Sequence, residues 1–239
     1  MSDHNADGDP PTIPISRTAR RQRKRAAKAR TKASFGGWLK ETAVMVAVAL
    51  LLSFLVKTFL IQAFHIPSGS MEHTLDVGDR ILVNKTVSPS SLARGDVIVF
   101  TDPGGWLPPQ PEEPQMRALA QDVLIALGIM PADAGEHLVK RIIGLPGDHV
   151  KCCTAEGLLE VNGAPLAEPY LDPATQPSLS EFDVEVPAGH LWMMGDNRGN
   201  SRDSRAHIGA PGGGFVPLEN VAGRAFFIMW PSSRWGSVN

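Results

Sequence analysis

Two serines in a short turn are the first residues of this chain that could do chemistry. Ser68 and Ser70 flank Gly69 and directly follow Pro67. A serine hydroxyl is a weak nucleophile until a neighbouring base takes its proton. Because serine and glycine are also common in linkers, the turn alone fits either a nucleophile on a constrained turn or a flexible connection.

A base for such a serine could be a histidine. The chain has seven histidines, and none lies in a recognisable triad motif. Triad members need not be neighbours in sequence, so this observation leaves the histidines open.

Lysine is the other candidate base. Side chains alternate along a predicted strand over residues 138–143, so either Lys140 or Arg141 faces the core. Only lysine can lose its charge on burial, so a sheet with one solvated face favours Lys140 inward. Burial would lower the lysine pKa from about 10.4 towards about 8, as a general base requires. A solvated Lys-Arg pair is the alternative reading, and Lys85, at the end of another apolar run, is a rival base.

Residues 195–205 are too polar for a core element and dense in opposite charges. Their two aspartates can pair with their arginines and so hold one loop conformation. A loop fixed in this way can present the hydroxyl of Ser201 to an amine. The stretch lacks metal-loop spacing, and the chain has no Cys/His zinc pattern, so no metal is expected. Gly212-Gly213-Gly214 has neither the phosphate-loop lysine nor the Rossmann spacing, so no nucleotide cofactor is expected.

The segment before the serine turn predicts a membrane helix. Residues 42–64 are uncharged except for Lys57, and about 20 apolar residues span a bilayer core. Nine basic residues in 17–32 give residues 1–37 a net charge of +6, against −8 for the remainder. Basic residues beside a membrane helix stay in the cytoplasm, so we expect this flank to meet the membrane and not nucleic acid.

The predicted organisation is a disordered basic cytoplasmic tail over 1–37, a transmembrane helix over 38–62 and an extracytoplasmic domain over 63–239. A cleaved signal peptide is the alternative, since Ser68-Gly69-Ser70 is a small-x-small site. The long apolar segment and the residues that precede it favour permanent anchorage instead.

The extracytoplasmic domain is predicted to be mainly β, with an antiparallel sheet. Strand patterns occur at 80–85, 96–100, 137–143, 158–161, 182–186, 191–194 and 224–230. Asn162-Gly163 is a strong hairpin signal. Residues 102–136 look like an insertion with a helix over 116–127, and residues from about 149 to 190 form a β-rich subdomain.

Five blocks, in order, give the chain a family resemblance. They are the apolar segment, residues 67–75, residues 78–85, residues 140–148 and residues 195–205. Together they resemble bacterial type I signal peptidases, membrane-anchored serine proteases that cleave signal peptides from exported preproteins. The resemblance implies cleavage after a small-x-small, Ala-x-Ala-like site by a Ser-Lys dyad in the cytoplasmic membrane.

The resemblance also implies residue roles. Ser70 would be the nucleophile and Lys140 the general base, while the Ser68 hydroxyl and the Ser70 N–H would form the oxyanion hole. Ser201 would orient Lys140. Asp203 and Arg205 would brace the polar loop. The residues that would contact the substrate are Ile66, Pro67, Met71, Leu75, Leu138 and Val139.

Two features depart from the family pattern. His73 stands where proline is usual, which puts the turn after Ser70 in question. Cys152 and Cys153 are adjacent, and the sequence leaves them reduced, oxidised or paired between chains. A membrane-tethered β-domain that binds extracellular partners without catalysis is the alternative function.

Overall fold

The computed structural model describes residues 17–108, 137–172 and 174–238. The chain divides into two units, one ending at Leu52 and the other beginning at Ser53. The predicted helix over 116–127 lies outside the described residues.

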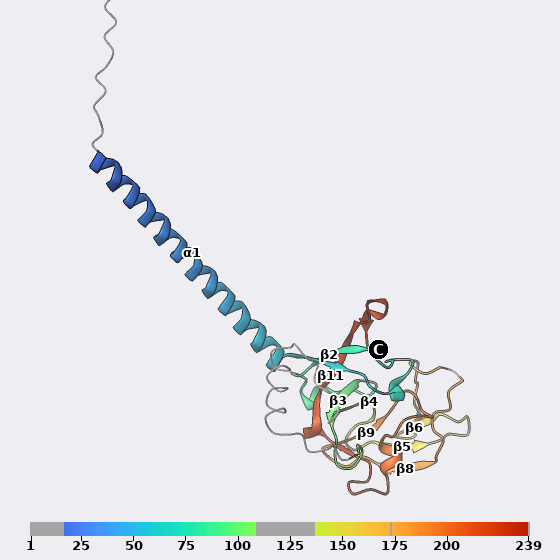
Figure 1. The fold of residues 1–239 in the computed structure, drawn as a ribbon. Helices are drawn as coiled ribbons and strands as arrows, with labels where there is room; N and C mark the ends of the chain where they lie inside the picture. Colours follow the sequence, from blue (N-terminus) through green and yellow to red (C-terminus); the bar gives the residue numbers. More distant parts are fainter. Residues whose placement is uncertain (1–16, 109–136, 173, 239) are drawn as a thin grey trace, which may run out of the picture. The chain divides into compact units, whose positions relative to one another are not determined.

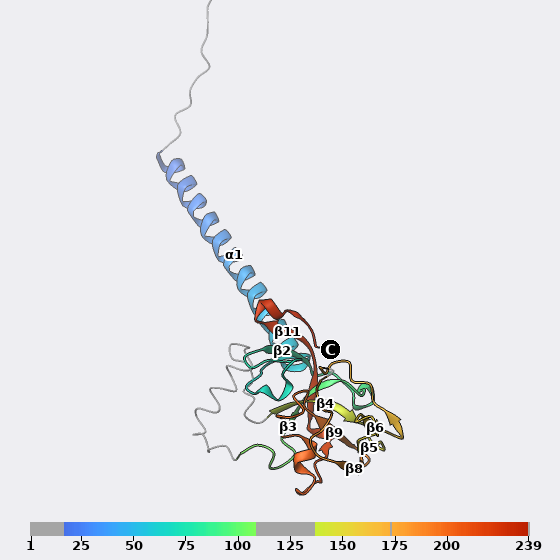
Figure 2. The same cartoon turned by 90° about the vertical axis from the view of Figure 1, so that its right-hand side faces the viewer.

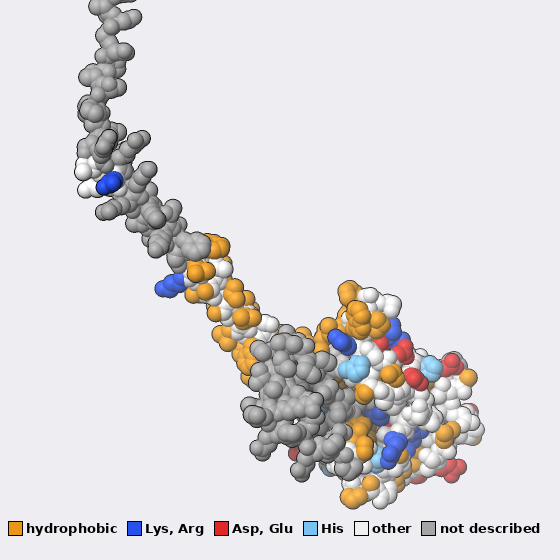
Figure 3. Space-filling model, in the orientation of Figure 1, with side chains coloured by type: hydrophobic (Ala, Val, Ile, Leu, Met, Phe, Trp, Pro, Cys, Tyr) orange, Lys and Arg blue, Asp and Glu red, His pale blue; other side chains and the backbone are white. Residues whose placement is uncertain are grey.

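A single long helix, α1 (Arg17–Phe59), is the first element (Figure 1). Its segment Gly37–Val56 is long and apolar enough to cross a membrane, because 20 residues of helix measure about 30 Å. Apolar side chains cover this segment on the face seen in Figure 3.

Helix α1 departs from the predicted organisation at both of its ends, although its candidate membrane span begins at Gly37, next to the predicted start at residue 38. The disordered tail predicted over 1–37 is wrong from Arg17 onward, because this Ala-, Lys- and Arg-rich stretch extends the apolar helix. The helix predicted to reach residue 62 ends at Phe59, and Ile61–His65 forms strand β1. All of β1 pairs with β2 through backbone hydrogen bonds. This pairing makes the segment a strand, although its apolar sequence continues that of α1.

The larger sheet has eight strands in the order β1-β2-β11-β3-β4-β9-β10, with β12 paired to β11. All its neighbours are antiparallel. The strands are β1 (Ile61–His65), β2 (Arg80–Asn84), β3 (Val97–Thr101), β4 (His137–Gly144), β9 (His190–Met194), β10 (Val216–Pro217), β11 (Val221–Trp230) and β12 (Gly236–Ser237).

The smaller sheet has the order β7-β6-β5-β8 and is also antiparallel. Its strands are β5 (His149–Cys152), β6 (Leu159–Val161), β7 (Ala164–Pro165) and β8 (Phe182–Glu185), and they lie within the range predicted for the β-rich subdomain. Both views show β5, β6 and β8 grouped beyond β9 (Figures 1 and 2). Asn162 and Gly163 have positive φ angles, as the predicted hairpin turn requires.

Short 3-10 helices connect the strands. They are η1 (Gly69–Met71), η2 (Pro89–Ser91), η3 (Ser204–His207), η4 (Leu218–Asn220) and η5 (Ser232–Arg234). All seven strand patterns read from the sequence are confirmed, and the domain is mainly β as predicted. Cys152 and Cys153 form a disulfide with each other.

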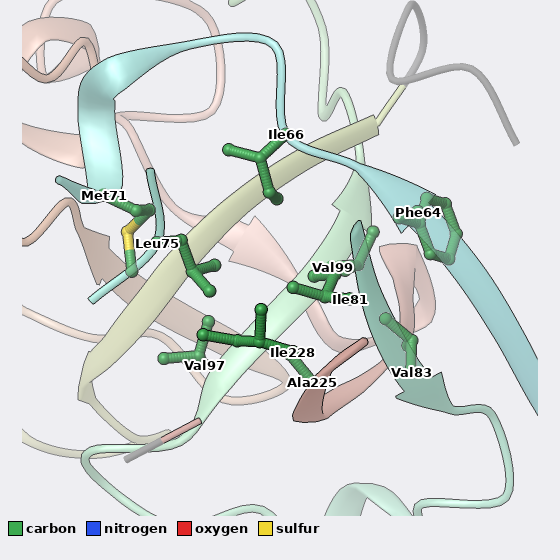
Figure 4. Close-up of a cluster of buried hydrophobic side chains, with 10 residues drawn as sticks. All are labelled: Phe64, Ile66, Met71, Leu75, Ile81, Val83, Val97, Val99, Ala225 and Ile228. Carbon is green, nitrogen blue, oxygen red and sulfur yellow. The ribbon is translucent and has the colours of Figure 1, made fainter. Parts of the chain in front are cut away.

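One apolar cluster supports the serine turn from below. Met71 and Leu75 enter it from the turn, together with Ile66 from the end of β1 (Figure 4). Its other fully buried members come from four strands: Phe64, Ile81, Val83, Val97, Val99, Ala225 and Ile228. Burying such side chains contributes about 1.5–3 kcal/mol each, so the turn is anchored at Met71 and Leu75.

Candidate active site

The serine turn is anchored on one side of Ser70 and exposed on the other. Ser70 lies half-buried within η1, and Met71 beside it is buried in the apolar cluster. Ser68 precedes the turn in an extended conformation and is exposed. The hydroxyl of Ser70 therefore stays accessible while the residue after it is fixed by packing.

Lys140 reaches this hydroxyl from β4. Its Nζ donates hydrogen bonds to Ser70 Oγ at 2.6 Å and to the carbonyl oxygen of Val139 at 3.0 Å. The lysine is 3% exposed. Burial lowers the pKa of Lys140 to about 8, although Asp203 and Asp196 oppose the shift by favouring the charged amine. The rival base, Lys85, directly follows β2 and is exposed.

The neighbouring Arg141 is also buried, which differs from the expectation for this strand. We predicted that only one of the two basic residues would be buried, but Arg141 is 2% exposed. Its guanidinium forms a two-pronged ion pair with Asp196, at 2.9 and 2.7 Å, and stacks over the ring of Tyr170. Both faces of β4 are covered, and the arginine is tolerated because its charge is paired.

The polar loop over 195–205 is fixed by ion pairs, but only one of them is the predicted one. Asp203, fully buried, pairs with Arg205 at 2.7 Å and accepts a hydrogen bond from the Gly195 N–H at 2.9 Å. The predicted pairing of the other aspartate is wrong, since Asp196 pairs with Arg141. Arg198 pairs instead with Glu168, which lies outside the loop.

Asn197 forms three hydrogen bonds with the serine turn, a role that the sequence did not predict. Its backbone N–H donates to the Ser70 carbonyl at 3.1 Å. Its side-chain amide donates to the Gly69 carbonyl at 3.0 Å and to the Glu72 carboxylate at 2.9 Å. The only signal in the sequence was its place inside a polar stretch already singled out.

Gly195 lets the polar loop approach the serine turn closely. A Cβ at this position would lie 2.4 Å from the Ser70 carbonyl oxygen and 2.3 Å from Ser201 Oγ. Ser201 is thereby placed in the site. Its Oγ is buried and has no hydrogen-bond partner among the described residues, so its orienting role remains a prediction.

The other predicted site residues lie in four different surroundings. Ser68 Oγ lies 3.4 Å from Ser70 Oγ. Val139 packs against the apolar cluster beside the turn, with Ile66, Met71 and Leu75, whereas Leu138 packs against a different cluster. Pro67 is exposed. The structure thus gathers four of the six predicted substrate-contacting residues beneath Ser70.

His73 gives the turn after Ser70 a conformation that proline cannot adopt. Its φ angle is +82°, whereas the proline ring fixes φ near −65°. The turn after Ser70 therefore accommodates histidine in place of proline through a backbone conformation that proline cannot adopt. Within the described residues, no group of three or more His, Cys, Asp or Glu side chains could hold a metal ion.

A half-buried serine that accepts a hydrogen bond from a buried, desolvated amine is the arrangement of a serine hydrolase with a lysine base. The family model for "Signal peptidase, peptidase S26" matches residues 39–230. The chain therefore belongs to the signal peptidase family S26, and it is a serine endopeptidase that cleaves signal peptides from secretory preproteins.

Individual relatives agree with this assignment. A signal peptidase I from Mycobacterium tuberculosis (strain CDC 1551 / Oshkosh) is 41% identical, over 99% of this chain and 83% of its own length. A probable signal peptidase I from Mycobacterium leprae is 42% identical over 84% of this chain and 79% of its own. A solved signal peptidase I from Enterococcus faecalis covers 56% of this chain and 95% of its own at 25% identity, with a TM-score of 0.36, too low to support an argument.

Proposed function

We propose that this endopeptidase uses Ser70 as nucleophile and Lys140 as general base. The observation that carries the proposal is the 2.6 Å contact between Lys140 Nζ and Ser70 Oγ, made by a lysine that is 3% exposed. A pKa lowered to about 8 leaves part of the Lys140 population neutral near neutral pH. The neutral amine has a lone pair, so at this distance it accepts the serine proton.

The reaction then follows in two halves. Lys140 takes the proton of Ser70 Oγ as the oxygen attacks the scissile carbonyl, and the resulting oxyanion is stabilised by the Ser68 hydroxyl and the Ser70 N–H. The intermediate collapses to an acyl-enzyme as the leaving amine takes the proton from Lys140. Lys140 next takes a proton from the water that attacks the ester, and it passes this proton to Ser70 Oγ as the signal peptide is released.

The apolar residues beneath the turn are proposed to select small side chains beside the scissile bond. Ile66, Met71 and Leu75 are buried members of one apolar cluster, and the partly buried Val139 packs against it. Such a packed surface leaves little room for a large substrate residue, which fits an Ala-x-Ala-like site. The predicted contacts with Pro67 and Leu138 belong to the same proposal.

The bilayer is proposed as the second partner, with the N-terminus in the cytoplasm and the catalytic domain outside the cytoplasmic membrane. The candidate span ends at Val56, so 70 − 56 = 14 residues separate it from Ser70, a chain reach of at most about 50 Å. The exposed apolar side chains at the end of β11 and after it also suit a membrane surface. They are Phe226, Met229, Trp230 and Trp235. Figure 3 shows an apolar patch beside the hairpin formed by β11 and β12.

The test of the nucleophile is cleavage of a preprotein by the purified full chain in detergent. Wild type should cleave and Ser70→Ala should not. Ser90→Ala, at an exposed serine of η2, is the matched control and should cleave like wild type. Equal cleavage by wild type and a folded Ser70→Ala would contradict the proposal.

Two further measurements test the site preference and the anchor. Replacing the alanine before the scissile bond of the substrate by phenylalanine should abolish cleavage. The mass of the membrane-extracted protein should show an intact N-terminus, whereas a mature form beginning at Met71 would lack the nucleophile. Protease added outside intact spheroplasts should digest the catalytic domain if its orientation is as proposed.

A further inference from the structure

Glu168 is a buried carboxylate that the proposed reaction does not use. It lies on the connection between β7 and β8, outside the polar loop, and its side chain is 7% exposed. Its Oε2 accepts from Arg198 Nη1 at 3.1 Å, and its Oε1 accepts from Arg198 Nη2 and from the Tyr170 hydroxyl, the latter at 2.7 Å. A carboxylate in this position is held by three donors, and Arg198 beside it has a side chain with no exposure.

Arg198 carries this contact into the active site. Its Nε donates to the Gly195 carbonyl at 3.0 Å, and its Nη1 also donates to the Pro177 carbonyl at 2.9 Å. Gly195 is the residue at which an added Cβ would collide with both the Ser70 carbonyl oxygen and Ser201 Oγ. A continuous chain of contacts therefore runs from Glu168 through Arg198 and Gly195 to the serine turn.

The same connection contacts the site at two more places. Ser178 Oγ accepts from Arg205 Nη1 at 3.2 Å, and Arg205 is the partner of Asp203. The Tyr170 ring lies 3.8 Å from the guanidinium carbon of Arg141. Burial and Glu168 raise the pKa of the Tyr170 phenol, so its hydroxyl stays protonated and donates to the carboxylate.

We propose that Glu168 is a positioning residue for the Ser70–Lys140 pair, through which the smaller sheet's β7–β8 connection helps to set the geometry of the active site. The inference rests on the proposed function of that pair. Without the carboxylate, Arg198 would be a buried cation lacking its counter-charge, which is strongly unfavourable. The loop would have to open to hydrate it, and Gly195 would move away from Ser70.

An opened loop affects Lys140 in a defined direction. The low pKa of Lys140 comes from its burial, so water admitted beside Gly195 would raise that pKa towards the ordinary lysine value. A purely structural ion pair would instead change stability alone. The kcat and the pH profile therefore separate a positioning role from a structural one.

The experiment measures preprotein cleavage by the full chain in detergent across pH for Glu168→Gln, which keeps the size of the side chain and removes its charge. We expect kcat to fall at least about tenfold with little change in KM, since a small misplacement of reacting groups is costly. The apparent pKa of the base should move upward. Glu181→Gln, at an exposed glutamate on the same connection, should match wild type in both.

A second variant covers the case in which Glu168→Gln does not fold. Glu168→Asp keeps the charge but withdraws it from Arg198. Its loss of kcat should be smaller than that of Glu168→Gln, and the apparent pKa of the base should again move upward. Wild-type kcat and pKa in a folded variant of either kind would overturn the inference, even if its stability fell. Wild type and Ser70→Ala measured alongside keep the proposals separate, because equal cleavage by those two would contradict the proposed nucleophile itself.

Discussion

Lys140 and Arg141 are adjacent on β4 and equally buried, yet only Arg141 has a carboxylate paired with its charge. The guanidinium meets Asp196 in a two-pronged ion pair, whereas the amine of Lys140 meets a hydroxyl and a carbonyl oxygen. A paired cation stays charged in the interior, and an amine without an adjacent carboxylate is driven towards neutrality. The strand thus holds one permanent charge that fixes the loop and one group free to exchange a proton.

The first prediction concerns the pH dependence of cleavage. The proposed base, Lys140, can accept a proton only when neutral, and its pKa is lowered to about 8, so kcat/KM should rise with pH and level off near that value. Below it the rate should fall about tenfold for each pH unit. The measurement is kcat/KM for the full chain on a preprotein from about pH 6 to about pH 10. A profile that stays flat down to the lower limit would falsify a lysine base.

The second prediction links the same lysine to stability. In the unfolded chain its pKa is about 10.4, above the value of about 8 in the folded protein, so between these values the unfolded state binds more protons. Wild-type stability should therefore rise with pH across this window, by about 3 kcal/mol from this group, and show no such gain below it. Lys140→Met lacks this gain.

Denaturant unfolding of wild type and Lys140→Met at a neutral and an alkaline pH measures the difference. Other titrating groups are common to both proteins and cancel in the comparison. Lys140→Met should be the more stable protein at neutral pH, with a margin that shrinks as the pH rises. A constant margin would show that Lys140 is not desolvated in the folded state.

Period-2 patterns predicted the strands and the inward-facing Lys140, because both depend on local alternation. The burial of Arg141 could not be read in this way, since Asp196 lies 55 residues away in sequence. Strand β1 was hidden for a similar reason. Its residues continue the apolar run of α1, and only the distant partner β2 makes them extended.

The polar loop was recognised by its composition, but its pairings were not. Local charge complementarity suggested that the aspartates and arginines of the loop pair with one another, which holds for Asp203 and Arg205. Arg198 instead pairs with Glu168 on the connection between β7 and β8, a contact set by tertiary packing. The hydrogen bond from the Asn197 N–H to the Ser70 carbonyl likewise depends on how the polar loop and the serine turn pack together.

The third prediction concerns the close approach of Gly195 to Ser70. An alanine Cβ would lie 2.3 to 2.4 Å from Ser201 Oγ and the Ser70 carbonyl oxygen, so one of the two turns must shift. Gly195→Ala should lower kcat/KM about 100-fold, the loss expected for a displacement of about 1 Å. Gly199→Ala is the control in the same loop, since its Cβ would meet no atom closer than 3.9 Å. Similar activities of the two variants would mean that the turns are not packed this tightly.

The last prediction tests the turn after Ser70. His73 has a φ angle of +82°, a left-handed conformation in which a residue other than glycine is strained by about 1–2 kcal/mol. His73→Gly can keep this backbone path without the strain and should cleave preprotein like wild type. His73→Pro cannot keep it, because the ring fixes φ near −65°, and it should lose activity together with more than about 1 kcal/mol of stability. The family resemblance implies proline at this position, so a fully active and stable His73→Pro would contradict the positive φ angle of this residue. Cleavage rates and unfolding midpoints of the two variants, measured against wild type, decide between these backbone conformations.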